Sequence, residues 1–158
     1  MGHSEGVNGD EVITTANVNA WARASRSPFP HMGPLDVAVW KRFLEVNTLA
    51  LRDIQYDVGL GGKGCDCIDD GDELKPMWAT LIRKRVDVVF FVGAVPWTCE
   101  VKPLANMAAL GQALTYKFLW DAEGRSKEKA RAAVICSRVD ADVEAVFNAY
   151  GVTVIVVS

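Results

Sequence analysis

One stretch, residues 85–103, limits what this chain can fold into more than any other part of the sequence. It reads Arg-Val-Asp-Val-Val-Phe-Phe-Val-Gly-Ala-Val-Pro-Trp-Thr-Cys-Glu-Val-Lys-Pro. Residues 86–92 are β-branched or aromatic apart from Asp87, residues 93–96 contain the turn formers glycine and proline, and residues 97–101 are extended in character again. The pattern predicts a β-hairpin, which would bring charges that are distant in the sequence onto neighbouring strands.

Three charged side chains lie on the two predicted strands of this hairpin, at positions that can bring them close together. Glu100 and Lys102 share one face of their strand because successive side chains alternate, and Val101 points the other way, towards a core. Asp87 lies near the start of the other strand, where the register can bring it close to them. Two carboxylates offer hard oxygen ligands to Mg²⁺, and a lysine places a cation beside a phosphate, so the trio predicts a metal-dependent phosphodiesterase site. An ion pair that only ties the strands together is the alternative.

A helix is predicted after the hairpin, from about residue 104 to residue 120. Its inner face is expected to consist of Met107, Gly111, Leu114 and Phe118. Gln112 and Tyr116 are four residues apart and therefore neighbours on one side of the helix, from which they can reach a phosphate oxygen, a metal-bound water or Lys102. An ordinary flank of an amphipathic helix is the alternative reading of this pair.

Together these residues resemble the PD-(D/E)XK nuclease superfamily, in particular its branch with a Gln-x-x-x-Tyr helix, found in RecB-type and lambda-exonuclease-like enzymes. The resemblance rests on Asp87, on the Glu100-x-Lys102 triplet and on the following helix with Gln112 and Tyr116. It extends over residues 36–158 only as an order of elements. Each part must sit on the right element, which makes the joint pattern more specific than a lone Glu-x-Lys.

The resemblance implies a restriction-endonuclease-like core and a role for each matched residue. Mg²⁺ or Mn²⁺ would be held by Asp87, Glu100 and the carbonyl group of Val101. Lys102 would orient or help to deprotonate the attacking water and stabilise charge on the phosphate, a task suited to lysine because its pKa falls readily on desolvation. Gln112 and Tyr116 would position the phosphate and the water.

A third carboxylate is expected from the first helix, which is predicted from Pro34 or Asp36 to Thr48. Members of the resembled superfamily often complete the metal site with a glutamate on this helix. Glu45 is therefore a candidate, reaching the metal through water. The open alternative is an exposed ion pair with Lys41, four residues earlier.

Contacts to nucleic acid must come from a local basic patch, because the net charge of −3 gives no overall attraction to a polyanion. The triplet Arg83-Lys84-Arg85 precedes Asp87 and is the main candidate for binding the phosphate backbone. Lys117 on the helix and Lys63 in the glycine run are further candidates. A solvated start of a strand explains the triplet equally well.

Other motifs are excluded or left without function. The glycine run at 59–64 lacks the spacing of a phosphate-binding loop, and it is predicted to be a turn after a strand at 51–60. The acidic segment 65–73 does not fit a calcium loop, because apolar residues fall where oxygen ligands are required, and a solvated loop is expected. The cysteines suit reduced thiols rather than a disulfide framework: Cys65, Cys67, Cys99 and Cys136.

The C-terminal third predicts a strand at 132–136, a helix capped by Asp140 and a strand at 152–157. Strand, helix and strand in this spacing imply a parallel pair. The fold class is therefore α/β, a mixed sheet flanked by helices in the order αβββαβαβ. Residues 1–33 are expected to form a flexible or loosely docked arm, and residues 34–158 a single nuclease-like domain.

The functional expectation is a Mg²⁺- or Mn²⁺-dependent nuclease whose substrate is DNA. The alternatives are a binding module that kept the fold without turnover, a dimeric junction or recombination endonuclease, and an enzyme of another class on a similar sheet. No apolar run approaches the roughly 20 residues of a membrane span, and no secretory pattern is found at the N-terminus, so a cytoplasmic protein without membrane contact is expected. A phage, mobile-element or repair setting is an expectation by association only.

Overall fold

The fold is an α/β arrangement with a five-stranded mixed sheet. The computed structural model describes residues 29, 31–62, 73, 76–77 and 81–158, so the predictions for most of the N-terminal arm, for Lys63 and for nearly all of the acidic segment lie outside the described residues. The described elements are α2 (Pro34–Val46), β1 (Leu51–Leu60), β2 (Lys84–Val92), β3 (Val95–Ala105), α4 (Met107–Ala122), β4 (Arg131–Val139), α5 (Ala141–Ala149) and β5 (Thr153–Val156).

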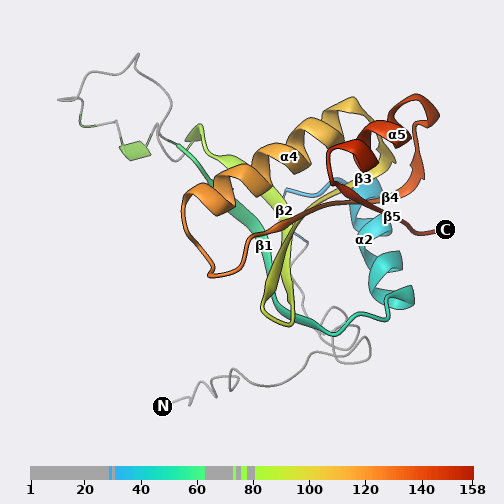
Figure 1. The fold of residues 1–158 in the computed structure, drawn as a ribbon, viewed down its shortest axis with the longest axis horizontal. Coiled ribbons are helices and arrows are strands. Elements are labelled where there is room, and N and C mark those ends of the chain that lie inside the picture. The colour runs from blue at the N-terminus through green and yellow to red at the C-terminus, as the bar shows by residue number, and fades with distance from the viewer. Residues whose placement is uncertain (1–28, 30, 63–72, 74–75, 78–80) are drawn as a thin grey trace.

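The sheet has the strand order β1-β2-β3-β4-β5 (Figure 1). The hairpin prediction is confirmed, since β2 pairs with β3 antiparallel, with Phe90 opposite Trp97. Strands β3, β4 and β5 are mutually parallel, so the predicted C-terminal parallel pair is also confirmed. Within the described part of the chain, no helix is long and apolar enough to cross a membrane.

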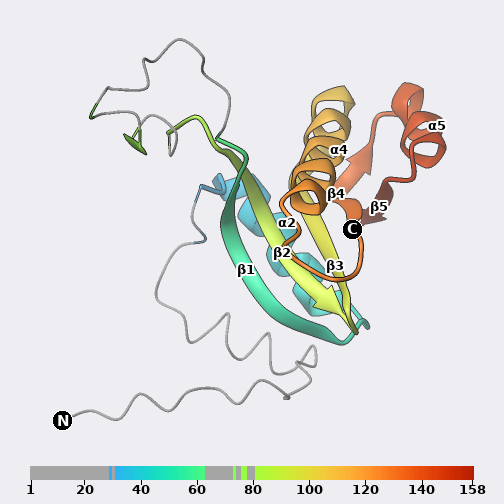
Figure 2. The ribbon, with the colours of Figure 1, turned by 60° about the vertical axis from the view of Figure 1, so that its left-hand side comes forward.

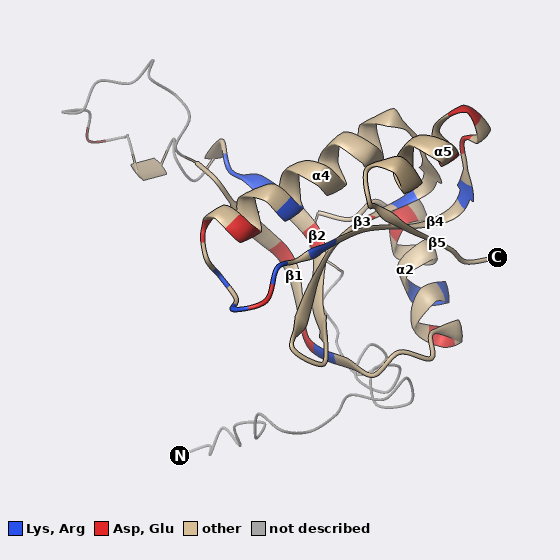
Figure 3. Cartoon of the chain, in the orientation of Figure 1, with Lys and Arg blue, Asp and Glu red and all other residues tan. Residues whose placement is uncertain are grey.

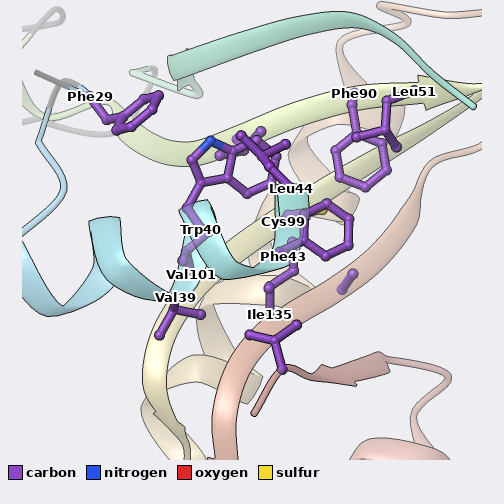
Figure 4. Packing of buried hydrophobic residues seen from close by; sticks show 13 residues of the cluster. Phe29, Val39, Trp40, Phe43, Leu44, Leu51, Phe90, Cys99, Val101 and Ile135 are labelled. Atoms are coloured by element: carbon purple, nitrogen blue, oxygen red, sulfur yellow. The ribbon is translucent and has the colours of Figure 1, made fainter. Parts of the chain in front are cut away.

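Helix α2 covers one face of the sheet, while α4 and α5 cover the other (Figure 2). The α2 face is dominated by stacked aromatic rings. Phe90 lies with Trp40 and Phe43 in this cluster (Figure 4), and its ring centroid is 6.5 Å from that of Trp40, 6.0 Å from that of Phe43 and 6.0 Å from that of Trp97. Phe29 was assigned to the arm, but it is buried in this cluster. The stack is the main apolar core, because large rings remove the most apolar surface from water.

The α4 face is packed differently, and the predicted inner face of α4 is wrong for Met107, Gly111 and Phe118, whereas Leu114 does pack against the core. The helix buries Ala109, Ala113, Tyr116 and Trp120. Met107 and Phe118 are 76% and 71% exposed, and Gly111 faces open space. Alanine has so little bulk that the helix can approach the sheet closely at Ala109 and Ala113, while Met107 and Phe118 are left on the outside.

Strand β1 is irregular where it passes β2. Its register shifts between Arg52 and Gln55, and Asp53 and Asp57 have positive φ angles of 48° and 52°. Aspartate tolerates this left-handed conformation better than most residues. The kink presents Asp57 to Arg85, whose Nε donates a 2.8 Å hydrogen bond to Asp57 Oδ1. That hydrogen bond lowers the pKa of Asp57, although burial acts in the opposite direction.

Two of the four cysteines lie in the described residues, Cys99 on β3 and Cys136 on β4. Both are buried and free. Burial raises the pKa of each thiol, so both stay protonated and unreactive near neutral pH. The expectation of reduced thiols is met for this pair.

Candidate active site

The site begins where strands β2 and β3 separate. Their ladder ends with the pair Val88 and Cys99, and the next residues along the two strands are Asp87 and Glu100. Beyond that point, Asp87 Oδ2 accepts a 2.9 Å hydrogen bond from the backbone N–H of Val101. A side chain thus satisfies a backbone donor that the ladder leaves unpaired, and the opening places two carboxylates side by side.

Glu100 is the unusual residue of the site, a glutamate that is only 1% exposed. Lys102 Nζ lies 3.1 Å from its Oε1 as an ion pair, but among the described residues neither carboxylate oxygen has a partner at full hydrogen-bond geometry. Burial and then the charge of Asp87 raise the pKa of Glu100 to about 7, although interactions with Lys102 and Tyr116 lower it. Burial likewise raises the pKa of Asp87. Two neighbouring buried carboxylates are costly to keep ionised, which makes this pair a suitable partner for a cation.

Lys102 is held between carboxylates. Besides Glu100, it lies 3.6 Å from Asp36 Oδ2. Burial lowers the pKa of Lys102, but the charges of Glu100 and Asp87 outweigh burial and the net pKa is raised. The fall in pKa that desolvation alone would cause is therefore outweighed at Lys102. Lys102 is a stable cation, suited to neutralising charge rather than to removing a proton.

Asp36 is the site residue that sequence reasoning missed. It was interpreted only as a helix cap, and it does receive a 3.2 Å hydrogen bond from the backbone N–H of Gly33 at the start of α2. The same oxygen faces Lys102. The sequence does show an acidic residue in the first turn of the first helix. Whether its side chain reaches Lys102 depends on how α2 lies against β3, which the sequence does not show.

Glu45 does not meet this cluster. It lies nine positions after Asp36 on the same helix, which places it about half a turn around and about 13 Å further along the axis. Its carboxylate is exposed and pairs with Arg42 Nη1 at 3.3 Å. The ion pair predicted as the alternative therefore exists, with Arg42 in place of Lys41, and Asp36 is the carboxylate that α2 contributes.

Gln112 and Tyr116 face the same region from α4. Gln112 Nε2 donates a 3.3 Å hydrogen bond to Tyr116 Oη. Burial and the charge of Glu100 raise the pKa of Tyr116, so its phenol stays protonated and keeps a proton to donate. The structure thus brings together five of the predicted residues, Asp87, Glu100, Lys102, Gln112 and Tyr116, which contact or electrostatically influence one another.

A groove of about 560 Å³ opens beside this cluster. One wall is the basic triplet that leads into β2, and the other is the exposed side of α4. Figure 3 shows basic residues at the start of β2, alongside α4. The lining residues are Arg83, Lys84, Arg85, Ala108, Gly111, Gln112, Thr115 and Tyr116. The triplet and the Gln112–Tyr116 pair, predicted separately, therefore share one hollow.

The three basic side chains of the groove differ in the hydrogen bonds and ion pairs that they form. Arg85 pairs with Asp57, and Arg83 Nε donates to the carbonyl oxygen of Gly61 at 3.2 Å. Lys84 is exposed and has no ion pair with any described residue. Lys117, another predicted nucleic-acid contact, forms a 2.7 Å ion pair with Asp121 and does not line this groove.

The donor set fits a hard divalent cation. In the described part of the chain, no three His, Cys, Asp or Glu side chains gather into a ready metal cluster. Mg²⁺ does not require one, because it keeps several waters and is commonly bound through one or two carboxylates together with substrate phosphates. Asp87 and Glu100 supply such a pair, and the oxygens of Glu100 that lack hydrogen bonds are the observation that makes a cation suitable there.

Comparison with protein-family models, with curated proteins and with solved structures finds no match for this chain. Its function is therefore argued from the geometry of the site.

Proposed function

We propose that this protein is a divalent-metal-dependent nuclease that hydrolyses phosphodiester bonds of DNA. The observation that carries the proposal is Glu100, a buried carboxylate with no good hydrogen bond, beside a second carboxylate and a lysine at the point where two strands part. The groove that Gln112 and Tyr116 line is also lined by three basic residues, so a polyanionic substrate bound there would lie against the Gln112–Tyr116 side of the site.

Asp87 and Glu100 would hold the ion, with the carbonyl group of Val101 as the third ligand that the resemblance implies. Bound Mg²⁺ or Mn²⁺ would supply a water of lowered pKa and positive charge at the scissile phosphate. Asp87 is already fixed by its hydrogen bond from the Val101 N–H, so this ligand is preorganised by the backbone.

Lys102 would neutralise the negative charge that develops on the phosphate. It is oriented from two sides, by Glu100 at 3.1 Å and by Asp36 at 3.6 Å, and its raised pKa keeps it charged. Gln112 orients the hydroxyl of Tyr116, and that hydroxyl would donate to a phosphate oxygen or to the attacking water. Preorganised donors of this kind stabilise charge without reorganising during the reaction.

The resemblance to PD-(D/E)XK nucleases supports the same proposal and adds a restriction-endonuclease-like core to it. A mixed α/β sheet with Asp87 on one strand of a hairpin and Glu100 and Lys102 on the other suits that family's arrangement.

A second candidate function is a nucleic-acid-binding module without turnover. It is favoured by one observation, the ion pairs that Lys102 already makes with Glu100 and Asp36. Such a cluster can be purely structural. The two candidates share the groove and differ in whether product is released.

The test is cleavage of linear duplex, circular duplex and single-stranded DNA with Mg²⁺, Mn²⁺ or EDTA. Wild type is compared with Glu100→Gln and Lys102→Met, which remove charge with little change in shape. Glu45→Gln is the matched control, because it removes the same charge from an exposed position away from the cluster. Thermal unfolding establishes that each variant is folded.

Metal-dependent cleavage by wild type and Glu45→Gln, lost at least 100-fold in both site variants, is the expected result. Absence of cleavage by folded wild type with either metal would overturn the nuclease and leave the binding module. Cleavage that persists in Glu100→Gln would show that another site or a contaminant is responsible.

A further inference from the structure

A second hollow continues the groove along α4. Its volume is about 370 Å³, and its lining includes Gly61, Leu119, Ala122 and Glu123. Lys84 lines both hollows, so its exposed side chain borders each of them. The two hollows follow α4 from Gln112 and Tyr116 at the active site to Ala122 and Glu123 near the C-terminal end of the helix.

Phe118 is not among the residues that line the two hollows, but it lies on the side of α4 that borders them. It follows Gly111, a lining residue, by seven helical positions, which returns it to within about 20° of the same direction around α4. Along the axis it falls between Thr115 of the first hollow and Ala122 of the second. Its ring is 71% exposed, and no aromatic ring of the described residues stacks on it.

The exposure of this ring has no structural reason within the described fold. The buried side of α4 is occupied by other residues, Trp120 among them, so Phe118 adds nothing to the core. The neighbouring wall of the groove consists of small side chains, with Ala108, Gly111 and Thr115. An aromatic face beside a basic groove is the combination that binds an unpaired strand, whose backbone follows the charge while a base stacks on the ring.

We propose that Lys84 and Phe118 form a nucleotide subsite for single-stranded nucleic acid, with a phosphate on Lys84 and a base stacked on Phe118. The placement of the subsite relative to the scissile bond rests on the proposed function, but the binding does not. A duplex is disfavoured because the faces of its bases are covered by their neighbours and cannot reach a side chain. Glu123 does not repel the strand strongly, since Arg125 and the N–H of Gly61 engage its carboxylate.

The proposal is tested by fluorescence anisotropy with a labelled 12-nucleotide oligothymidine and a blunt duplex of the same length, in EDTA. Wild type is compared with Phe118→Ala, Phe118→Trp and Lys84→Gln. Tyr150→Ala is the matched control, because Tyr150 is 66% exposed on α5 and lines neither hollow. The same oligonucleotide with abasic positions removes stacking but keeps the phosphates.

Phe118→Ala is expected to weaken single-strand binding by about 5- to 100-fold, whereas Phe118→Trp and Tyr150→Ala bind like wild type. Lys84→Gln should weaken binding and reduce the slope of log affinity against log salt by about 0.7, the value for one phosphate contact on a single strand. The abasic strand should bind equally to wild type and Phe118→Ala.

Equal binding of the thymidine strand by wild type and Phe118→Ala overturns the subsite. If that variant instead changes the oligomeric state in light scattering, the ring is a contact between copies of the chain. EDTA prevents metal-dependent cleavage, so the assay measures binding alone. Binding that depends on Phe118 would therefore support the subsite even if the protein never cleaves DNA. If the protein cleaves DNA but binds single strands equally with and without the Phe118 ring, the nuclease proposal is supported and the subsite is ruled out.

Discussion

The two ends of the β2–β3 hairpin carry opposite kinds of structure. Towards its turn, the ladder is intact and Phe90 stacks against Trp97 and against two rings of α2. Towards its open end, the ladder stops and Asp87 and Glu100 face each other with few hydrogen bonds. The strands are the same, so the difference shows how a sheet can be fixed at one end and left chemically unsatisfied at the other.

The largest effect on stability is expected for Phe90→Ala, at the packed end of the hairpin. The truncation opens a cavity among Trp40, Phe43 and Trp97 and is expected to lower the free energy of unfolding by about 3 to 5 kcal/mol. Urea denaturation measures it. Cleavage per folded molecule should remain near that of wild type, because the carboxylates lie at the other end of the hairpin.

The control is Phe118→Ala, which removes the same ring from an exposed position and should change stability by no more than about 0.5 kcal/mol. Equal destabilisation by both variants would contradict the assignment of the aromatic stack as the main core.

At the open end, Glu100→Gln should abolish cleavage and stabilise the metal-free protein. Because the folded pKa of Glu100 is about 7 and its ordinary value is 4.5, the folded state holds this proton more tightly than the unfolded state. The free energy of unfolding therefore falls as pH rises from about 4.5 to about 7. Glutamine removes that loss, and we expect a gain of about 1 to 3 kcal/mol at pH 8 that disappears near pH 4.5.

Urea denaturation in EDTA at pH 4.5, 6 and 8 measures this gain. Lys102 remains solvated and keeps Asp36 as an ion-pair partner in the variant, so no isolated buried charge is left behind. A variant that is less stable than wild type at pH 8 would show that the Glu100–Lys102 pair is structural.

The smallest effect is expected for Asp36→Asn. This substitution separates the orientation of Lys102 from the stability of the fold. Asparagine keeps an acceptor for the Gly33 N–H but loses the charge that faces Lys102. Stability should stay within about 0.5 kcal/mol of wild type. Steady-state kinetics should show kcat reduced about 3- to 10-fold with KM nearly unchanged, since a partly exposed charge pair contributes about 1 kcal/mol. A change confined to KM would place Asp36 in substrate binding instead.

Much of the fold follows from local patterns in the sequence. Strand β1 has the predicted bounds of Leu51 and Leu60, and α2 begins at the predicted Pro34. The central trio was also predictable, because a period of two places Glu100 and Lys102 on one face and a short turn brings Asp87 to the neighbouring strand. These features depend only on neighbours in the sequence or across one hairpin.

The remaining features depend on how separate elements meet. Helix α4 is apolar on nearly every side, so its sequence does not show that Ala109 and Ala113 face the sheet while Phe118 faces out. The direction of α2 decides that Asp36, rather than Glu45, reaches Lys102. Charges from three elements set the raised pKa of Lys102.

The hydrogen bond from the Val101 N–H to Asp87 has a consequence for genetic screens of this protein. Asp87 both completes the sheet and faces the proposed cation position, so a replacement without a side-chain acceptor leaves a backbone donor unpaired as well as removing a proposed ligand. In a library scored for abundance and for activity, apolar substitutions at Asp87 should fail both scores, as those in a hydrophobic core do. Substitutions at Glu100 can leave abundance unchanged and still abolish activity. Glu100 is therefore the position at which such a screen would distinguish a functional role from a structural one.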